Sequence, residues 1–376
     1  MLANILRFKR IIVLTVLLLV LIMISPLKTS LQNEIALEAN AHLNELMASP
    51  NSFLLSSPAP ISGGAKVEPE LLKTPIVTND ELNAWFDRSQ TQALIVQKKG
   101  RIIYERYSAD ADDGRNINAM SMTKTIVAIL IGIAVDEGLI NSEKDSISLY
   151  LPEIKQHPTH AITLRDLLRH TSGIQSTSQD LRATLGGNPL ITPLSAISFK
   201  GDRSFRYDNI NYHLLSLALT RVYKKPLNRL IEDKLWHPLN LEKAAIINTT
   251  GYCCVFATAR SWLEIGNLFL NPTNGVVSSH WINKMVKDTL IPEWFFVQAT
   301  GKSAGNTYGY HLYGGLPELS EVFWIEGMGL QLVMINPQTQ TIIVRLGGIP
   351  SALNVFSNRY DSSIIAPLLK TLTTER

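Results

Sequence analysis

The sequence has very little cysteine, and its two residues of this type, Cys253 and Cys254, are neighbours. Because there is no third cysteine for either of them to pair with, a disulfide framework is excluded. A disulfide between neighbours requires a strained eight-membered ring, so we expect two reduced, partly buried thiols. Disulfide bonds are therefore not expected to stabilise this fold.

The chain also lacks an excess of charge of one sign. Its formal net charge is +3, with 18% charged and 45% hydrophobic residues, which is the composition of a globular protein. Its 376 residues suit one large domain or two smaller ones. The basic runs "QKKGR" and "VYKKP" are short and typical of solvated turns. Nucleic acid is therefore not an expected partner.

Metal-binding and phosphate-binding motifs are absent from the sequence as well. Four histidines, His170, His213, His237 and His311, are scattered, with no Asp or Glu at ligand spacing. We expect each to be a surface or packing residue, with His311 the one best placed to line a pocket. The glycines in "GGLPELSEVFW" are not accompanied by the lysine of a phosphate loop. Neither a metal nor a cofactor is expected.

Residues 1–27 have the pattern of a membrane segment. Three basic residues precede the apolar run Ile11–Ile24, which Ser25-Pro26 ends. With its apolar flanks the run approaches the roughly 20 residues of a membrane span, and the charges place its N-terminus in the cytoplasm. The Ala-x-Ala of residues 39–41 lies too far downstream for ordinary cleavage, which favours an uncleaved anchor over a cleaved signal peptide. Either interpretation implies that the rest of the chain is exported.

Two regions follow this segment. Residues 28–78 are typical of a stalk, because "LQNEIALEANAHLNELM" has helical periodicity and "SSPAPISGGA" has the composition of a flexible linker. We expect the folded domain to span residues 79–376, beginning where "NDELNAWFDRS" can cap and open a helix.

The stretch "NINAMSMTKTIVAILIGIAVDEGLI" places a serine and a lysine at the start of a long apolar run. The run predicts a helix that is buried on all sides and that Gly138 can end with a left-handed turn. On this helix Ser121 and Lys124 share one face of the first turn. Burial lowers the pKa of a lysine, which makes it a general base for a neighbouring hydroxyl nucleophile. The N–H groups of the helix N-terminus favour a negative oxygen nearby.

The Ser-x-x-Lys motif has a second, purely structural interpretation, in which both residues simply begin a helix. It occurs by chance about once or twice in a chain of this length. Residues 25–28, Ser-Pro-Leu-Lys, match it too. Context separates the two matches, because Ser25 lies at the edge of the membrane-type segment and opens no helix.

Two further segments contain residues that can complete a site. "FRYDNINYHLLSLAL" places Tyr207 and Asn209 just before an apolar helical run. A phenol near a lysine can relay a proton, and an amide can bind a substrate carbonyl, although a tyrosine before a helix is more often a packing residue. "FWIEGMGLQ" contains glycines that allow a close backbone approach at a strand edge, where N–H groups can face a ligand.

The pattern of elements predicts an α+β fold. "TQALIVQKKGRIIYERYS" is typical of a β-hairpin, and "EVFWIEGMG", "LQLVMINP" and "TIIVRLGG" of short strands before a final helix in "SSIIAPLLKTL". "HAITLRDLLRHTSGI" predicts a short helix, capped by Thr163 with Asp166 and ended by Gly173. We expect one antiparallel sheet built from both chain ends and flanked by helices, with an all-helical subdomain.

Together these motifs resemble those of the serine β-lactamase and penicillin-binding-protein superfamily, in its class C-like branch. Residues 121–124, Ser-Met-Thr-Lys, match its Ser-x-x-Lys motif, and residues 207–209, Tyr-Asp-Asn, match its Tyr-x-Asn motif. "ITLRDLLRHTSGI" is similar to the helix and turn that follow the family's nucleophile helix. Over residues 79–372 the chain is most similar to the 6-aminohexanoate-dimer hydrolase branch.

This resemblance implies roles for individual residues. Ser121 would be acylated, Lys124 and Tyr207 would transfer its proton to the leaving group, and Asn209 would orient the substrate. The backbone N–H groups of Ser121 and Met328 would form the oxyanion hole.

The third motif departs from the family pattern. β-Lactamases have Lys-Thr-Gly where this chain has Ile325-Glu326-Gly327. Because no cation stands there and Glu326 has the opposite charge, β-lactams and other carboxylates are expected to be poor substrates. Gln331 follows a leucine where relatives tend to carry glycine, which leaves the register around Met328 open.

We therefore expect a membrane-anchored serine hydrolase that cleaves an ester or amide bond in a small molecule. Its catalytic domain would lie on the periplasmic side of a bacterial inner membrane, or be secreted if the N-terminal segment is cleaved. The alternative is a non-catalytic or slowly acylated penicillin-binding-type protein that senses or tethers a ligand. The presence of Ser121, Lys124 and Tyr207 together favours the enzyme, because a non-catalytic scaffold does not need all three.

Overall fold

The computed structural model of the chain describes residues 58–64, 80–109, 111, 114–154, 161–174, 197, 203–247, 251–273, 275–290, 307–316, 319–348 and 362–373. All of them belong to the unit that runs from Met47 to Arg376. The predicted anchor and most of the predicted stalk lie outside these residues. Within them, no helix has the length and apolar character that crossing a membrane requires.

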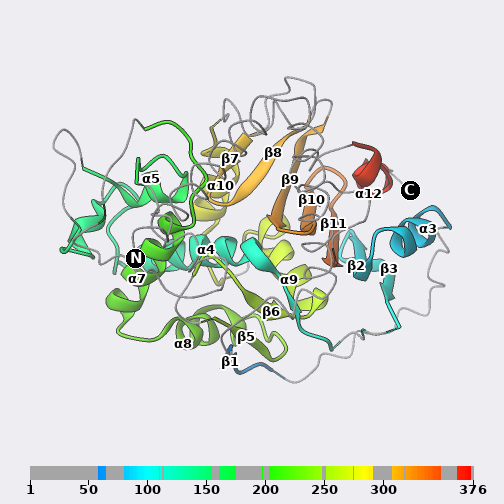
Figure 1. Cartoon of the computed structure of the whole chain (residues 1–376), viewed down its shortest axis with the longest axis horizontal. Coiled ribbons are helices and arrows are strands. Elements are labelled where there is room, and N and C mark those ends of the chain that lie inside the picture. The colour runs from blue at the N-terminus through cyan, green and yellow to red at the C-terminus, as the bar shows by residue number, and fades with distance from the viewer. Residues whose placement is uncertain are drawn as a thin grey trace, which may run out of the picture. The chain divides into compact units, whose positions relative to one another are not determined.

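An antiparallel sheet, with seven strands among the described residues, is the centre of the fold (Figure 1). Its order is β3-β2-β11-β10-β9-β8-β7, so a hairpin from the start of the domain lies beside strands from its end. The strands are β2 (Thr91–Lys98), β3 (Arg101–Tyr107), β7 (Thr307–Gly309), β8 (Leu312–Leu316), β9 (Leu319–Gly327), β10 (Gln331–Asn336) and β11 (Thr341–Gly347). The predicted sheet from both chain ends is confirmed.

Tight turns set the register of this sheet. Lys99 and Gly100, between β2 and β3, both have positive φ, 49° and 77°, as the favoured two-residue hairpin turns require. Between β9 and β10 the chain turns within three residues, so that Gly327 pairs with Gln331. Every residue of β10 and β11 is buried, which is expected of central strands that are covered on both faces.

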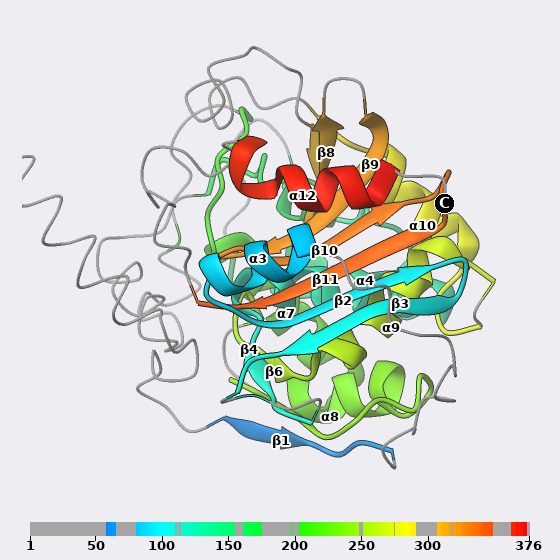
Figure 2. The same cartoon turned by 90° about the vertical axis from the view of Figure 1, so that its right-hand side faces the viewer.

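Helices cover both faces of the sheet. The α-helices are α3 (Asp80–Arg88), α4 (Thr123–Asp136), α5 (Leu164–Leu168), α7 (Ile210–Tyr223), α8 (Leu227–Ile231), α9 (Ala259–Leu270), α10 (Ser279–Lys287) and α12 (Ser362–Thr373). Shorter turns are η2 (Met120–Met122), η3 (Ile147–Leu149) and the π-helical η5 (Glu232–Trp236). Figure 2 shows α3 and α12 in front of the sheet, with α9 behind it. At Gly266 of α9, an added Cβ would lie only 3.0 Å from Val333 and 3.1 Å from Ile342.

A second, small sheet was not predicted, because its strands are only two or three residues long. It has the order β1-β5-β6-β4, with β1 (Ala59–Ile61), β4 (Ile117–Asn118), β5 (Ala244–Ile246) and β6 (Val255–Ala257). Ile61 pairs with Ala244 and is 1% exposed. Residues 58–64 are thus part of the folded domain, and not of the flexible linker that their Ser, Pro and Gly content suggested.

The predicted nucleophile helix is present as α4, and it is buried almost all round. Gly138 follows it with a φ of 70°, as the left-handed end requires. Gly132 lets Trp281 of α10 lie directly on the helix, where its indole N–H donates to the carbonyl of Ala128 at 3.0 Å. A side chain at residue 132 would occupy the place of this indole.

Two expectations about local structure were wrong. Cys253 and Cys254 are joined in a disulfide across a cis peptide bond, with their Cα atoms 3.3 Å apart, and are not free thiols. The capping box of Thr163 and Asp166 is confirmed, but α5 ends at Leu168. His170, with a φ of 56°, makes the left-handed turn there, ahead of Gly173. Sequence reasoning assigns such turns to glycine, so a histidine in this conformation gives no signal.

Candidate active site

Ser121 lies in the η2 turn, between β4 and α4. The preceding residue, Met120, has a φ of 52°, which is unusual for a residue with a side chain. Its N–H donates to Oδ1 of Asn118 at 2.9 Å, and its carbonyl accepts from the Thr123 hydroxyl at 2.9 Å. Backbone in such conformations persists where surrounding contacts impose it, often at functional sites.

Strand β6 fixes the same segment from the other side. The N–H of Ala119 donates to the carbonyl of Val255 at 2.9 Å, and the N–H of Val255 donates to Oγ1 of Thr123 at 2.8 Å. Ser121 is thereby held at the start of α4, and it is partly exposed while its neighbours in the helix are buried.

Lys124 is fully buried beside Ser121. Its Nζ lies 3.0 Å from Oγ of Ser121 and donates to the carbonyl of Tyr252 at 2.8 Å. Burial lowers the pKa of Lys124 well below its usual value, and the negative charge of Asp208 opposes that shift. A neutral amine at this distance can accept the proton of the serine hydroxyl.

Tyr207 completes the group of predicted catalytic side chains. The centre of its ring lies 5.0 Å from Nζ of Lys124. The Tyr207 ring also stacks on the ring of His170, with centroids 4.5 Å apart and an interplanar angle of 29°. The structure therefore brings Ser121, Lys124 and Tyr207 together, although they come from two different segments of the chain.

Asn209 lies at the N-terminus of α7. Its Oδ1 is buried and has no hydrogen-bond partner in the described part of the chain. Buried polar groups are normally paired, so an unpaired one beside Tyr207 is available to a ligand. This placement agrees with a substrate-orienting role.

The third motif approaches Ser121 through its backbone. A Cβ on Gly327 would lie 2.3 Å from the carbonyl oxygen of Ala119 and 3.1 Å from Cβ of Met120, so only glycine fits there. The end of β9 is thereby packed against the turn that carries Ser121. Met328 follows directly and is partly exposed, where its N–H can face a ligand.

The side chain of Glu326 lies on the other face of β9. Successive side chains of a strand point to opposite faces, so Glu326 shares its face with Trp324, whose indole N–H donates to its carboxylate at 3.2 Å. Ile325 and Gly327 share the face that looks toward η2, and Ile325 is fully buried there. The structure thus places the backbone of this motif, and not the Glu326 carboxylate, against the Ser121 turn.

A buried arginine supports the turn after Gly327. Arg345 is fully buried, and burial lowers its pKa to about 9, so it remains a cation at neutral pH. Its five N–H donors reach the carbonyls of Gly329 (2.6 Å), Leu330 (3.1 Å), Ser89 (2.8 Å) and Gly348 (2.6 Å) and the hydroxyl of Thr91 (3.0 Å). Gln331 adds a bond to the carbonyl of Gly347 at 2.6 Å. Together they fix the β9–β10 turn.

The remaining predicted histidines, His311, His213 and His237, do not contact Ser121 in any bond found among the described residues. His311 is fully buried, and its Nδ1 lies 2.9 Å from the hydroxyl of Thr125, the residue next to Lys124. Burial and then the charge of Lys124 lower the pKa of His311. His213 is buried against Tyr252, and His237 is exposed. His311 is therefore a packing residue beneath the lysine.

One cluster has the composition of a metal site. Glu232, Asp233 and His237 have ligand atoms within 4.8 Å of one another. Both carboxylates are already ion-paired, Glu232 with Arg229 at 2.9 Å and Asp233 with Lys225 at 2.5 Å. Structural ion pairs explain this cluster, and it is not part of the Ser121 site.

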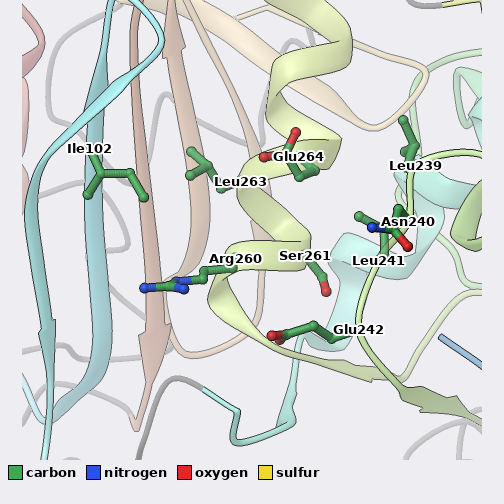
Figure 3. Close-up of a pocket in the computed structure, with 9 residues that line it drawn as sticks. All are labelled: Ile102, Leu239, Asn240, Leu241, Glu242, Arg260, Ser261, Leu263 and Glu264. Atoms are coloured by element: carbon green, nitrogen blue, oxygen red, sulfur yellow. The ribbon is translucent and has the colours of Figure 1, made fainter. Parts of the chain in front are cut away.

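A pocket of about 340 Å³ lies between α9, β3 and the segment before β5 (Figure 3). Glu242 contributes a buried Oε2 that has no hydrogen-bond partner among the residues described. Arg260 is bonded to Glu105 by two contacts, at 2.7 and 2.9 Å. None of its lining residues belongs to the Ser121 group, so this pocket is separate from the candidate active site.

The chain is similar in sequence to known proteins. A family model described as Beta-lactamase matches residues 86–362. The chain belongs to the beta-lactamase family. It is 22% identical to the 6-aminohexanoate-dimer hydrolase of Paenarthrobacter ureafaciens over 342 residues, which are 77% of this chain and 83% of that protein.

Solved structures show the same fold. A proposed 6-aminohexanoate-dimer hydrolase from Bacillus anthracis superposes with a TM-score of 0.68 at 17% identity, covering 88% of this chain and 95% of that one. The octameric penicillin-binding protein homologue from Pyrococcus abyssi superposes with a TM-score of 0.62 at 17% identity, covering 78% and 76%. The α+β fold that the resemblance to β-lactamases and penicillin-binding proteins implied is confirmed.

Three contributors to the site were not found from the sequence. The carbonyl of Tyr252 gives no signal, because every residue has one. Arg345 lies in a predicted strand with no sign of its partners, although a charged residue in the apolar run "TIIVRLGG" is an indication of a buried role. The sequence predicts only a surface or packing role for His170, because its contact with Tyr207 joins two distant segments.

We expect Gly327→Ala to slow the reaction of Ser121 with a fluorophosphonate by on the order of 100-fold, because a displacement of about 1 Å at an active site can have that effect. The added methyl would push β9 away from the η2 turn. Gly314→Ala, on β8 of the same sheet, is the control. An added Cβ there would have one close neighbour, Oγ1 of Thr307 at 3.0 Å, and its other neighbours would lie beyond 3.4 Å, at ordinary van der Waals distance. Equal labelling rates in both variants would contradict the assigned packing.

Proposed function

We propose that the chain is a serine hydrolase that cleaves an ester or amide bond through an acyl-enzyme on Ser121. The observation that carries this proposal is the fully buried amine of Lys124, 3.0 Å from Oγ of Ser121. A buried lysine that served only the fold would be expected to have a carboxylate partner, and the bonds found for this one are to a hydroxyl and a carbonyl.

In the proposed mechanism, the neutral amine of Lys124 takes the proton of Ser121 as Oγ attacks the carbonyl carbon of the substrate. The N–H groups of Ser121 and Met328 stabilise the oxyanion, and Oδ1 of Asn209 orients the substrate by accepting from it. Collapse of the tetrahedral intermediate breaks the bond to the leaving group. The leaving group receives the proton from Lys124 by way of the Tyr207 hydroxyl. Water then attacks the ester on Ser121, and the proton transfers run in the reverse direction.

The preferred substrates in this proposal are neutral esters and amides. On β9, the position that carries a lysine in β-lactamases is Ile325, which is fully buried and apolar. A carboxylate bound there would have no countercharge from this strand. The relation to a 6-aminohexanoate-dimer hydrolase supports cleavage of an amide bond, and a β-lactam is expected to be hydrolysed slowly.

We expect Ser121→Ala to abolish hydrolysis and Lys124→Ala to reduce it by a factor of about 10³ or more, since the two residues act as a unit. For the same reason, the double variant should be little worse than either single variant. Ser25→Ala, in the other Ser-x-x-Lys match, is the control and should be as active as wild type. Turnover close to wild type in Ser121→Ala, measured with p-nitrophenyl esters and small amides, would refute the proposal. Stable labelling of Ser121 without turnover would instead indicate the slowly acylated sensor.

The pH dependence gives a second test. Only unprotonated Lys124 acts as a base, so kcat/KM should rise with pH through the lowered pKa of Lys124. Asp208 raises that pKa, because its negative charge favours the protonated amine. We expect Asp208→Asn to lower the pKa further and to move the acidic limb of the profile to lower pH, over a range of roughly pH 5 to 10.

Asn can still accept the hydrogen bond that Oδ1 of Asp208 takes from the N–H of Ile210 at 3.1 Å, so the start of α7 is preserved. Asp233→Asn removes an exposed carboxylate and is the control. A shift of the limb to higher pH in Asp208→Asn would show that Lys124 is not the titrating base.

The proposal includes export across the inner membrane with Ile11–Ile24 as an uncleaved anchor, supported by its apolar sequence and the basic residues before it. We expect alkaline phosphatase fused after Arg376 to be active and a cytoplasmic reporter at the same point to be inactive. Recovery of a mature protein that begins near residue 26 or 42 would show instead that the segment is a cleaved signal peptide.

A further inference from the structure

We propose that His170 is a positioning residue that holds the Tyr207 phenol beside Lys124. The proposal rests on the catalytic role proposed above for Tyr207. It concerns a residue outside the Ser-x-x-Lys and Tyr-x-Asn motifs, on the turn that follows α5.

His170 is bonded to both neighbours of Tyr207 in the chain. Its carbonyl accepts from the N–H of Arg206 at 2.8 Å, and its ring Nδ1 accepts from the N–H of Asp208 at 3.2 Å. The ring itself stacks on the phenol at 4.5 Å between centroids. One residue therefore fixes the backbone before Tyr207, the backbone after it and the plane of its ring.

The tautomer of His170 follows from these bonds. Nδ1 accepts from the Asp208 N–H and lies 3.1 Å from the side-chain amide nitrogen of Asn211, so the ring proton is on Nε2. Burial and then the charge of Lys124 lower the pKa of His170 well below its usual value. His170 is thus a neutral acceptor, which does not add a second positive charge next to the lysine.

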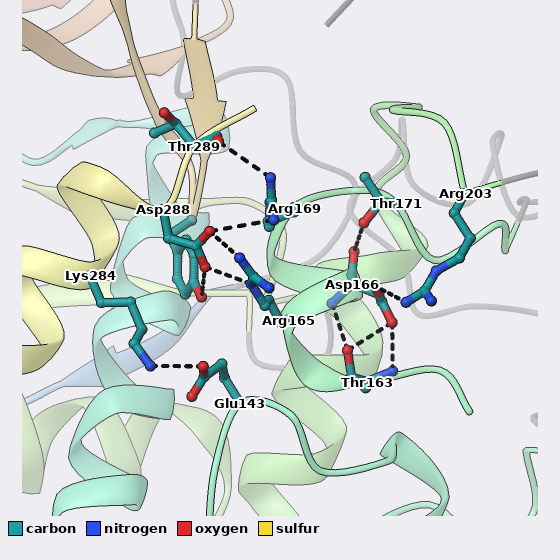
Figure 4. A network of polar contacts seen from close by, with 11 residues as sticks. Glu143, Thr163, Arg165, Asp166, Arg169, Thr171, Arg203, Lys284, Asp288 and Thr289 are labelled. Carbon is teal, nitrogen blue, oxygen red and sulfur yellow. Dashed lines mark hydrogen bonds and ion pairs between the residues drawn. The ribbon is translucent and has the colours of Figure 1, made fainter. Parts of the chain in front are cut away.

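The turn that carries His170 is itself fixed by polar contacts on both sides (Figure 4). Before it, Arg169 is ion-paired with Asp288 at 3.4 Å and donates to the carbonyl of Thr289 at 3.3 Å. After it, the N–H of Thr171 donates to the carbonyl of Asp166 at 2.8 Å. These contacts hold the backbone on both sides of His170, whose φ is 56° and whose ring stacks on Tyr207.

Two other elements bond to the end of α5. The carbonyl of Leu168 accepts from the Tyr212 hydroxyl of α7 and from the N–H of Tyr310, in the β7–β8 turn, each at 3.1 Å. Arg165 makes a two-contact ion pair with Asp288, which also accepts from the Tyr310 hydroxyl at 2.9 Å. The position of His170 is therefore set by α5, α7 and the sheet together.

Two substitutions separate the contributions of His170. Phe keeps an aromatic ring for stacking but removes the acceptor, and Asn keeps an acceptor close to Nδ1 and tolerates a positive φ. If the acceptor positions Tyr207, His170→Phe should lower kcat by on the order of tenfold or more with little change in KM, since general acid–base assistance contributes roughly 10²- to 10⁴-fold. His170→Asn should stay within about threefold of wild type.

The deciding experiment repeats both substitutions in a Tyr207→Phe background. A residue that acts through the Tyr207 hydroxyl has no further effect once that hydroxyl is gone, so the double variants should have the kcat of Tyr207→Phe alone. Leu219→Ala is the control for general destabilisation. Leu219 is a core residue about 15 Å from the N-terminus of α7, so this variant should keep the wild-type kcat at temperatures below its own unfolding temperature.

Losses that multiply in the double variants would overturn the positioning role while leaving the proposed function intact. Turnover equal to wild type in Tyr207→Phe alone would overturn the catalytic role of Tyr207, and this inference with it. If His170→Phe does not fold, His170→Asn decides the question in the two backgrounds. A kcat close to wild type, or a loss that disappears in the Tyr207→Phe background, supports the positioning role, and a loss of equal size in both backgrounds overturns it.

Discussion

The buried amine of Lys124 is the feature on which the rest of the site depends. A charged ammonium in this position would be strongly disfavoured by desolvation, and no carboxylate bonds to it among the described residues. The amine instead has two neutral partners, the hydroxyl of Ser121 and the carbonyl of Tyr252, at 3.0 and 2.8 Å. It is therefore poised to take up a proton, and the surrounding structure determines where that proton comes from and where it goes.

The groups around the amine also influence its charge. His170 and His311 are both buried with lowered pKa values, so neither adds a competing positive charge near the lysine. Asp208 supplies the opposing negative charge from the Tyr207 segment. Close backbone packing at Gly327 brings the strand edge to the turn that carries Ser121, and Arg345 fixes the β9–β10 turn through carbonyls and a hydroxyl. The two groups bonded to the amine are thus neutral, and the charge of Asp208 acts on it without a direct bond between them in the described part of the chain.

Much of this arrangement was predictable from the sequence, and the reasons are local. The apolar run after Ser121 predicted α4, Lys99-Gly100 predicted the hairpin, and Thr163 with Asp166 predicted the start of α5. The motifs also gave Ser121, Lys124 and Tyr207. What could not be predicted depends on contacts between distant segments: the β1–β5 pairing, the left-handed turn at His170, the Tyr252 carbonyl, and the face of β9 on which Glu326 lies. A disulfide between adjacent cysteines was judged too strained, and the structure has one.

The order of strands in the large sheet has a consequence for synthesis of the chain. β2 pairs along its length with β11, with Lys98 opposite Thr341, so the central pairing cannot form until almost the whole chain has been made. Ser121 emerges from the ribosome early, whereas Gly327 and Arg345 emerge late. A growing or truncated chain therefore carries Ser121 without the strand edge that completes its surroundings. The assembly of the candidate site is in this way tied to completion of the chain.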